Sequence, residues 1–206
     1  MRRLFLATLG LLAGAGLTVA QAAVTQYSDR SAFLGGIAAS HSGPVTQDFS
    51  GVSGDWTDIM GETIGGITYG SVTDGMVSVA GPASGPEYDW GTGSVLAVSY
   101  ESESITLTFA PTIAFGASFG TLWDSAGDVI ISILGNDYVI ETNTIPVWVF
   151  AGFISDIPFT SVTITTGGTS NLTVMDDIIL AIPEPVSLAL FGAALLGLGV
   201  TRRRRA

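Results

Sequence analysis

Residues 104–109 read Ser-Ile-Thr-Leu-Thr-Phe, with an apolar side chain at every second position. This period of two is typical of a β-strand with one buried face, because successive side chains of a strand point to opposite sides. The same alternation recurs at residues 128–134 and 159–166. These stretches predict a sheet that buries one face and presents Ser and Thr on the other.

Shorter or less regular strands surround these three. They are expected at residues 45–49, 64–69, 76–80, 95–100, 112–119, 138–141, 146–153 and 172–181. Glycine-rich turns such as Gly65-Gly66 and Gly135-Asn136-Asp137 separate them. Many short strands joined by tight turns favour an all-β fold, an antiparallel two-sheet sandwich that we expect to be jelly-roll-like.

One segment before the strands has a helical pattern. Residues 29–38 place Phe33 and Ile37 on one apolar face, and Asp29 or the serine before it is a suitable N-cap. Two glycines in the segment keep it short. The sequence therefore predicts one short N-terminal helix beside the sandwich.

The charge of the chain is divided unevenly. Residues 23–182 contain a single cation, Arg30, and seventeen of the eighteen acids, which gives this stretch a formal charge of −16. Such a balance excludes nucleic acid as a partner, because phosphate binding needs Lys and Arg. The chain has no cysteine, so disulfides and thiol chemistry are excluded as well. We expect 23–182 to be one acidic domain, with most carboxylates simply solvated.

The N-terminus has the three parts of a secretory signal peptide. Arg2 and Arg3 precede an apolar stretch at 4–17, and Ala20 and Ala22 occupy the small-residue positions that signal peptidase requires. We expect residues 1–22 to be removed, so that the mature chain starts at Ala23. The alternative is an uncleaved membrane anchor.

The C-terminus carries a stiff extended motif, an apolar stretch and a basic end. Pro183, Glu184 and Pro185 come first, residues 186–200 are apolar apart from one serine, and the basic tail is Arg202, Arg203, Arg204 and Arg205. A transmembrane-type helix over 186–200 would be about 22 Å long, shorter than the ~30 Å hydrocarbon core. The arginines are expected to stay in the cytoplasm, which leaves the acidic domain outside.

This tail, residues 183–206, resembles the PEP-CTERM sorting signal in order, spacing and terminal position. The resemblance implies a Gram-negative bacterium whose exosortase-type membrane protease recognises the tail during a transient stay in the inner membrane. It also implies an association with exopolysaccharide and biofilm. The alternative is a plain C-terminal anchor.

The domain itself resembles the generic domain that many PEP-CTERM proteins carry. The matching pieces are Asp29–Phe33, Asp48-Phe49, Leu96–Val98, Ile105–Phe109, Phe115-Gly116, Phe119-Gly120, Gly152-Phe153, Val162–Ile164 and Asp176-Asp177-Ile178. The resemblance implies a β-sandwich and no catalytic residue.

The sequence offers little for catalysis. His41 is the single histidine, and it lies in a small-residue loop without a nucleophile elbow, which argues against a Ser-His-Asp triad and against a histidine-ligated zinc. Two carboxylates could serve a polysaccharide hydrolase, but no pair stands out among seventeen. We therefore expect no enzymatic activity.

An acidic and aromatic loop is the candidate for glycan binding. Glu87, Tyr88, Asp89 and Trp90 combine carboxylates with rings, and residues 55–58 form a second such cluster. Sugar sites use carboxylates for hydroxyl groups and ring faces for stacking. The alternative is that the rings pack down as loop anchors while the acids face water.

A calcium site is the candidate for an ion. Asp48 and Asp176 would meet if the strands near the two ends of the domain pair, and carboxylates are the ligands that calcium prefers. Asp177 should point to the opposite face from Asp176. The alternative is that these are strand-end acids without a metal, and we expect no other cofactor.

These observations lead to one expectation and two alternatives. We expect a non-enzymatic exported protein of the cell envelope, outer surface or extracellular matrix. The alternatives are a lectin-like, glycan-binding module and a polysaccharide hydrolase.

Overall fold

The computed structural model describes residues 22–39, 43–71, 77–98, 104–122, 127–143, 146–167 and 172–181. Its strands are β1 (Val24–Tyr27), β2 (Val45–Gln47), β3 (Thr57–Asp58), β4 (Thr63–Ile64), β5 (Ile67–Ser71), β6 (Val77–Ala80), β7 (Val95–Val98), β8 (Ser104–Thr121), β9 (Asp128–Ile133), β10 (Asn136–Glu141), β11 (Val149–Gly167) and β12 (Thr173–Ala181). The described helices are α1 (Arg30–Ala38) and the short 3-10 helices η1 (Pro82–Ser84) and η2 (Pro86–Tyr88).

The strands form two antiparallel layers that share their two longest strands. The first sheet contains β1, the N-terminal half of β11, the C-terminal half of β8, and β12, which pairs on its other edge with β2 and β7; β6 and β3 follow. The second sheet contains β10, β9, the C-terminal half of β11, the N-terminal half of β8, β5 and β4. The expected all-β sandwich with one helix is thereby confirmed.

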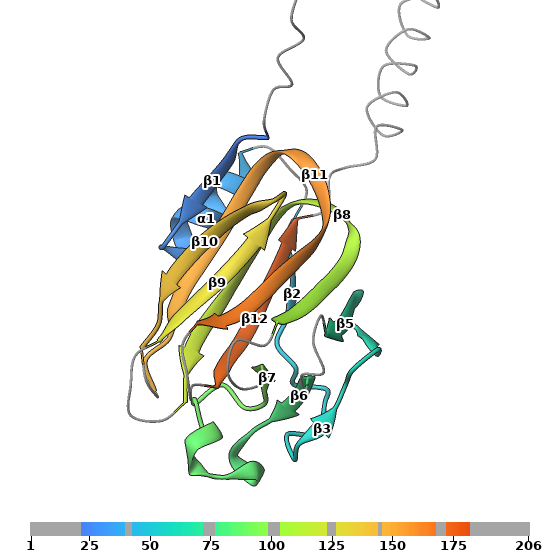
Figure 1. The fold of residues 1–206 in the computed structure, drawn as a ribbon, viewed down its shortest axis with the longest axis vertical. Helices are drawn as coiled ribbons and strands as arrows, with labels where there is room; N and C mark the ends of the chain where they lie inside the picture. Colours follow the sequence, from blue (N-terminus) through green and yellow to red (C-terminus); the bar gives the residue numbers. More distant parts are fainter. Residues whose placement is uncertain are drawn as a thin grey trace, which may run out of the picture.

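The two sheets are connected by sharp bends in β8 and β11. The pairing of these strands shifts register between Ile154 and Phe159 and again before Ser161. Pro111 lies in one bend and Pro158 in the other, where a residue without an N–H group interrupts the hydrogen-bond ladder least. Figure 1 shows both strands turning over at the same end of the molecule. Long strands that pass from one sheet to the other are a known way to close a sandwich.

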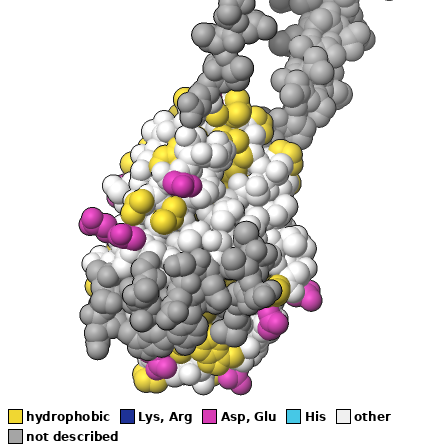
Figure 2. Space-filling model, in the orientation of Figure 1, with side chains coloured by type: hydrophobic (Ala, Val, Ile, Leu, Met, Phe, Trp, Pro, Cys, Tyr) yellow, Lys and Arg dark blue, Asp and Glu magenta, His cyan; other side chains and the backbone are white. Residues whose placement is uncertain are grey.

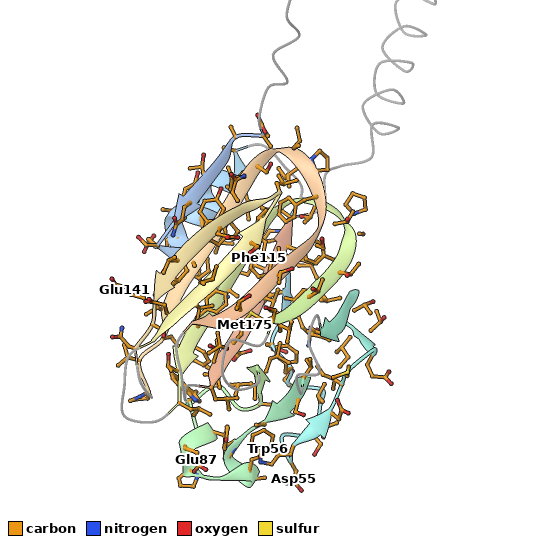
Figure 3. The ribbon with its side chains drawn as sticks, viewed as in Figure 1. Asp55, Trp56, Glu87, Phe115, Glu141 and Met175 are labelled. Carbon is orange, nitrogen blue, oxygen red and sulfur yellow. The ribbon has the colours of Figure 1, made fainter. Side chains whose placement is uncertain are left out.

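The main core lies between the two sheets. Phe115, Phe119 and Met175 come from the first sheet, and Leu107 and Ile131 come from the second; all five are fully buried. Figure 3 shows Phe115 and Met175 in the middle of the molecule. Their positions agree with the period of two, which puts alternate residues of β8 on the core side before and after its bend.

Helix α1 covers part of the outer face of the first sheet. Asp29 caps it by accepting a hydrogen bond of 2.7 Å from the Ala32 N–H, as the sequence predicts. The ring of Phe33 lies on Gly116 and Gly152, where a Cβ atom would come within 2.7 Å and 2.6 Å of the ring. These two glycines make room for the helix.

Some expectations fall on other parts of the chain. No helix among the described residues is long and apolar enough to cross a membrane. Residues 1–21 of the signal peptide, His41 and the sorting tail, including Pro183, Glu184, Pro185 and the four terminal arginines, lie outside the described residues.

Candidate functional site

The two acidic and aromatic clusters meet at the end of the molecule opposite the bends. The ring of Trp56 packs edge-on against that of Tyr88, with ring centres 4.8 Å apart. The rings of Trp90 and Trp148 also contact each other, with ring centres 4.5 Å apart. Figure 3 shows Asp55, Trp56 and Glu87 at this end. The sequence places the clusters more than thirty residues apart and gives no signal that they touch.

The rings of the candidate glycan loop are buried. Tyr88 is 4% exposed and Trp90 is 3% exposed, whereas Asp89 faces solvent and Glu87 is partly exposed. The Trp90 indole sits directly on Gly120 of β8, in space that a side chain would fill. A ring that stacks on a sugar needs a free face, so Tyr88 and Trp90 do not form a stacking platform. They have the loop-anchor arrangement that the sequence left open as the alternative.

The strand pairing that the sequence suggested brings Asp48 near enough to Asp176 for its charge to act on the Asp176 carboxyl group. β2 pairs with one end of β12, with Ile178 opposite Gln47, and β7 pairs with the other end, with Met175 opposite Leu96. Asp176 lies between these two pairings, and it is 1% exposed. Its carboxylate accepts a hydrogen bond of 2.7 Å from the Asp177 N–H.

The environment of Asp176 favours its neutral form. Burial raises its pKa to about 6, against the lowering effect of hydrogen bonds from the Asp177 N–H and the Thr92 hydroxyl. The nearby charges of Asp177 and Asp48 raise it further. The pKa of Asp48 is shifted in the opposite direction. Asp48 is exposed, and hydrogen bonds from the N–H and hydroxyl of Ser50 lower its pKa. This pair therefore holds one ionised and one partly protonated carboxyl group near neutral pH.

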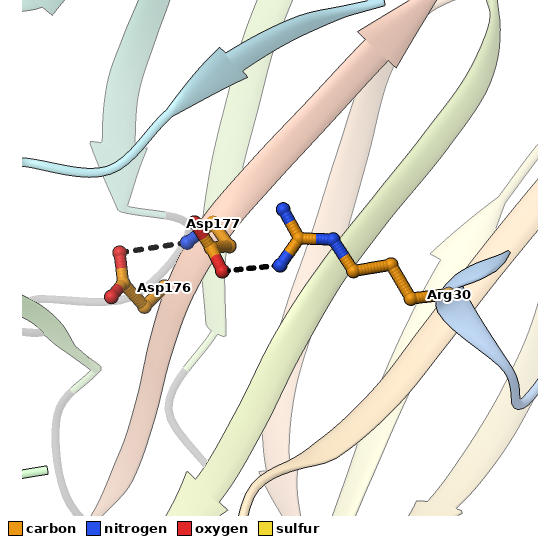
Figure 4. Close-up of polar contacts among 3 residues, drawn as sticks. All are labelled: Arg30, Asp176 and Asp177. Carbon is orange, nitrogen blue, oxygen red and sulfur yellow. Dashed lines mark hydrogen bonds and ion pairs between the residues drawn. The ribbon is translucent and has the colours of Figure 1, made fainter. Parts of the chain in front are cut away.

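Asp177 points the other way, toward helix α1. Its carboxylate forms an ion pair of 2.5 Å with Arg30, and Figure 4 shows the two aspartates on opposite sides of β12. Asp177 has a φ of 53°, and the pairing of β12 with β8 shifts register here. This bulge separates the two side chains. The alternation rule predicted the separation but not the partner, Arg30.

The described residues do not form a metal centre. Among them, no group of three or more His, Cys, Asp or Glu side chains converges as metal ligands would. Asp48 and Asp176 offer two carboxylates, and Asp176 already accepts two hydrogen bonds. Calcium usually takes six to eight oxygen ligands.

Among the described residues, the outer face of the second sheet carries hydroxyl groups. Three pairs of hydroxyl groups are hydrogen-bonded across neighbouring strands. The oxygen–oxygen distances are 2.7 Å for Thr63 and Thr68, 2.6 Å for Ser104 and Thr165, and 3.4 Å for Thr106 and Thr163. In the view of Figure 2, acidic side chains lie on this side of the molecule, and one of them lies among uncharged and hydrophobic side chains in its upper part. One carboxylate of the face is Asp137, which accepts a hydrogen bond of 2.6 Å from the Ser132 hydroxyl.

A groove runs along one side of this face, between the β9–β10 turn and the bend of β11. It has a volume of about 450 Å³. Four hydroxyl side chains and three apolar side chains line it, together with Gly135: Ser132, Thr160, Ser161 and Thr163, and Leu134, Pro158 and Phe159. Sequence reasoning missed this groove, because it depends on the bend at Pro158. The run of Ser and Thr in 159–166 was the signal available.

A second groove has a different character. It has a volume of about 320 Å³ and is lined by Gly127, Asp128, Glu141, Thr142 and Asn143. Asp128 and Glu141 face each other as register partners on β9 and β10. Two carboxylates line this groove, and no aromatic or apolar side chain lines it with them.

Comparisons with known proteins place the chain in no family. No family model matches it, and no curated protein matches it. Among solved structures it is similar to the K2 cleaved adhesin domain of Lys-gingipain, with a TM-score of 0.44 and 14% sequence identity. The similarity covers 68% of this chain and 99% of that one.

Proposed function

We propose that this chain is a non-enzymatic exported protein of the bacterial surface or extracellular matrix, sorted through its C-terminal tail. The signal-like N-terminus and the tail at 183–206 support export and sorting by an exosortase-type protease. We also propose two features of the architecture: the sandwich closes in a jelly-roll-like manner, and the C-terminal tail forms a transmembrane-type helix. Association with exopolysaccharide or biofilm belongs to the same proposal.

One observation supports a structural role above the others: many carboxylates of the described residues hold the fold in place. Asp29 caps α1, and Asp177 pairs with Arg30. Asp58 and Asp89 accept hydrogen bonds from the backbone two residues later. Carboxylates used in this way stabilise turns and are not free to act as an acid and a base.

The sorting proposal is tested at the two ends of the native protein. Mass spectrometry should find a mature chain that begins at Ala23 and lacks the four terminal arginines. Replacing Pro183, Glu184 and Pro185 together with alanine should leave an unprocessed form in the membrane. An intact C-terminus in wild-type cells with a working exosortase would refute the proposal.

The open groove favours glycan binding as a second candidate function. Hydroxyl side chains beside an apolar wall suit the polar and apolar faces of a sugar. The carboxylate of Asp137, which accepts a hydrogen bond of 2.6 Å from the groove residue Ser132, adds an acceptor for sugar hydroxyl groups. On a glycan array, binding should be lost in the Thr160→Val and Ser161→Ala variants and kept in Thr108→Val, which changes the same face outside the groove. If the wild-type protein binds no glycan on the array, the glycan-binding function is refuted and the structural role stands by itself.

The hydrolase alternative is tested at the acidic groove. Turnover of a polysaccharide that disappears in both Asp128→Asn and Glu141→Gln would overturn the non-enzymatic proposal. We expect no turnover.

A further inference from the structure

Ala23 and Asp156 are joined by two hydrogen bonds where strand β1 begins. The Ala23 N–H donates to Oδ1 of Asp156 at 2.9 Å, and the Asp156 N–H donates to the Ala23 carbonyl at 3.1 Å. The next residues continue as a regular antiparallel pair, with Val24 opposite Ser155. The nitrogen of Ala23 is therefore held against a carboxylate by the register of β1 on β11.

We propose that Asp156 is a binding site for the α-ammonium group that forms when the Ala22–Ala23 peptide bond is cut. This inference rests on the export part of the proposed function. Hydrolysis breaks that C–N bond, and water supplies the oxygen of the new Ala22 carboxylate. The Ala23 nitrogen takes up protons and becomes an ammonium at neutral pH. The hydrogen bond from a neutral N–H to the Asp156 carboxylate then becomes an ion pair, in which both donor and acceptor are charged.

The strand register makes the site specific for one terminus. A cut one residue earlier or later moves the new ammonium along the strand by about 3.4 Å. After an earlier cut, the terminal nitrogen belongs to Ala22 and is one residue away from the position that contacts Asp156. After a later cut, Ala23 and its nitrogen are removed altogether. The structure therefore links one cleavage position, Ala22–Ala23, to one carboxylate.

The charges around β1 leave Asp156 available for this role. It is the one charged residue of β11, and its side chain is exposed. The charged groups at the start of α1, which packs against β1, have partners of their own. Arg30 pairs with Asp177, and Asp29 accepts a hydrogen bond from the Ala32 N–H.

The chain suits a direct measurement, because all of its basic side chains other than His41 are arginines. The α-amino group of the processed chain is therefore its sole primary amine. Reductive methylation with ¹³C-formaldehyde gives it a single NMR signal, whose pH titration reports the α-amino pKa. The experiment uses the whole chain from Ala23 onward, held in detergent.

The expected result is an α-amino pKa about half a unit or more above its usual value of ~7.7–8.0. In Asp156→Asn the pKa should return to that usual range. Asp128→Asn removes the same charge at a distant position and should leave the raised value unchanged. Equal pKa values in the wild-type chain and in Asp156→Asn would overturn the proposal.

Stability gives a second readout with a defined sign. A cation with a raised pKa stabilises the fold below its unfolded pKa, near 8, and this contribution is lost as the pH rises through the folded pKa. The chain that begins at Ala23 should melt higher at pH 7 than a chain that retains Gln21 and Ala22. The difference should vanish at pH 10 and in Asp156→Asn. A difference that persists in Asp156→Asn contradicts the ion pair.

Failure of the export proposal is distinguishable from failure of this inference. Mass spectrometry of the native protein reports where the chain is cut. A chain produced to begin at Ala23 reports the ion pair whatever that native terminus is.

Discussion

Gly116 of β8 and Gly152 of β11 lie opposite each other in the first sheet, and the ring of Phe33 rests on both. Because neither glycine has a side chain, the sheet forms a shallow seat for the aromatic ring. The seat fixes where α1 docks, and it identifies two positions at which a single methyl group should be poorly tolerated.

Gly116→Ala should displace Phe33 and destabilise the domain by about 1–3 kcal/mol, the usual cost of overpacking. Urea unfolding followed by fluorescence measures this change. Gly35→Ala is the matched control, because a Cβ atom there meets nothing within 4 Å and alanine favours a helix. The idea fails if both variants have the wild-type midpoint.

Trp90→Ala should destabilise the domain by about 3–5 kcal/mol, as expected for removal of a buried aromatic side chain. The cause is loss of its packing on Gly120 and Trp148. Trp56→Ala should cost less, because Trp56 is only partly buried. Thermal unfolding distinguishes the two, and a Trp90→Ala protein with an unchanged melting temperature would contradict the buried position.

Asp176 should make the domain lose stability between about pH 4 and pH 6. An acid with a pKa of about 6 when folded and about 3.9 when unfolded binds more protons in the folded state, so stability falls as the pH rises through this window. At pH 7 the loss is on the order of 2–3 kcal/mol.

Asp176→Asn should remove this part of the pH dependence and be more stable than the wild-type protein at pH 7. Asp89→Asn, which removes a charge at an exposed position, should keep the wild-type profile. Parallel stability curves for the wild-type protein and Asp176→Asn from pH 4 to 7 would refute the assignment.

Calcium and sodium should give the same melting temperature at equal ionic strength. Both screen the self-repulsion of an acidic domain, over about 10 Å at 0.1 M salt. Among the described residues, no group of three or more His, Cys, Asp or Glu side chains converges at Asp48 and Asp176 as calcium ligands would. A calcium-specific rise that is lost in Asp48→Asn would instead establish these residues as ligands.

Local pattern predicted much of the fold. The period of two identifies core-facing residues of β8, β9 and β11, and Asp29 is one of the two N-cap candidates of α1 that the sequence offers. The pairing of β2 with β12, on which the approach of Asp48 to Asp176 depended, is present. These features depend on residues close in sequence or on one long-range pairing.

The rest depended on packing that local pattern does not encode. The sequence predicts two separate strands in place of each of β8 and β11, whereas Pro111 and Pro158 lie at bends within continuous strands. β1 and β3 were missed because segments of four and two residues carry little periodicity. The burial of Trp90 required the seat at Gly120, which lies thirty residues away in the sequence.

The position of β12 has a mechanical consequence. Hydrogen bonds hold it on both edges, to β8 on one side and to β2 and β7 on the other. A pull on Ala181 along the strand axis therefore loads these bonds in shear, so that they must give way together and not one after another. If the tail that follows Ala181 tethers this domain, the force of the tether enters the fold through the strand that is best placed to resist it.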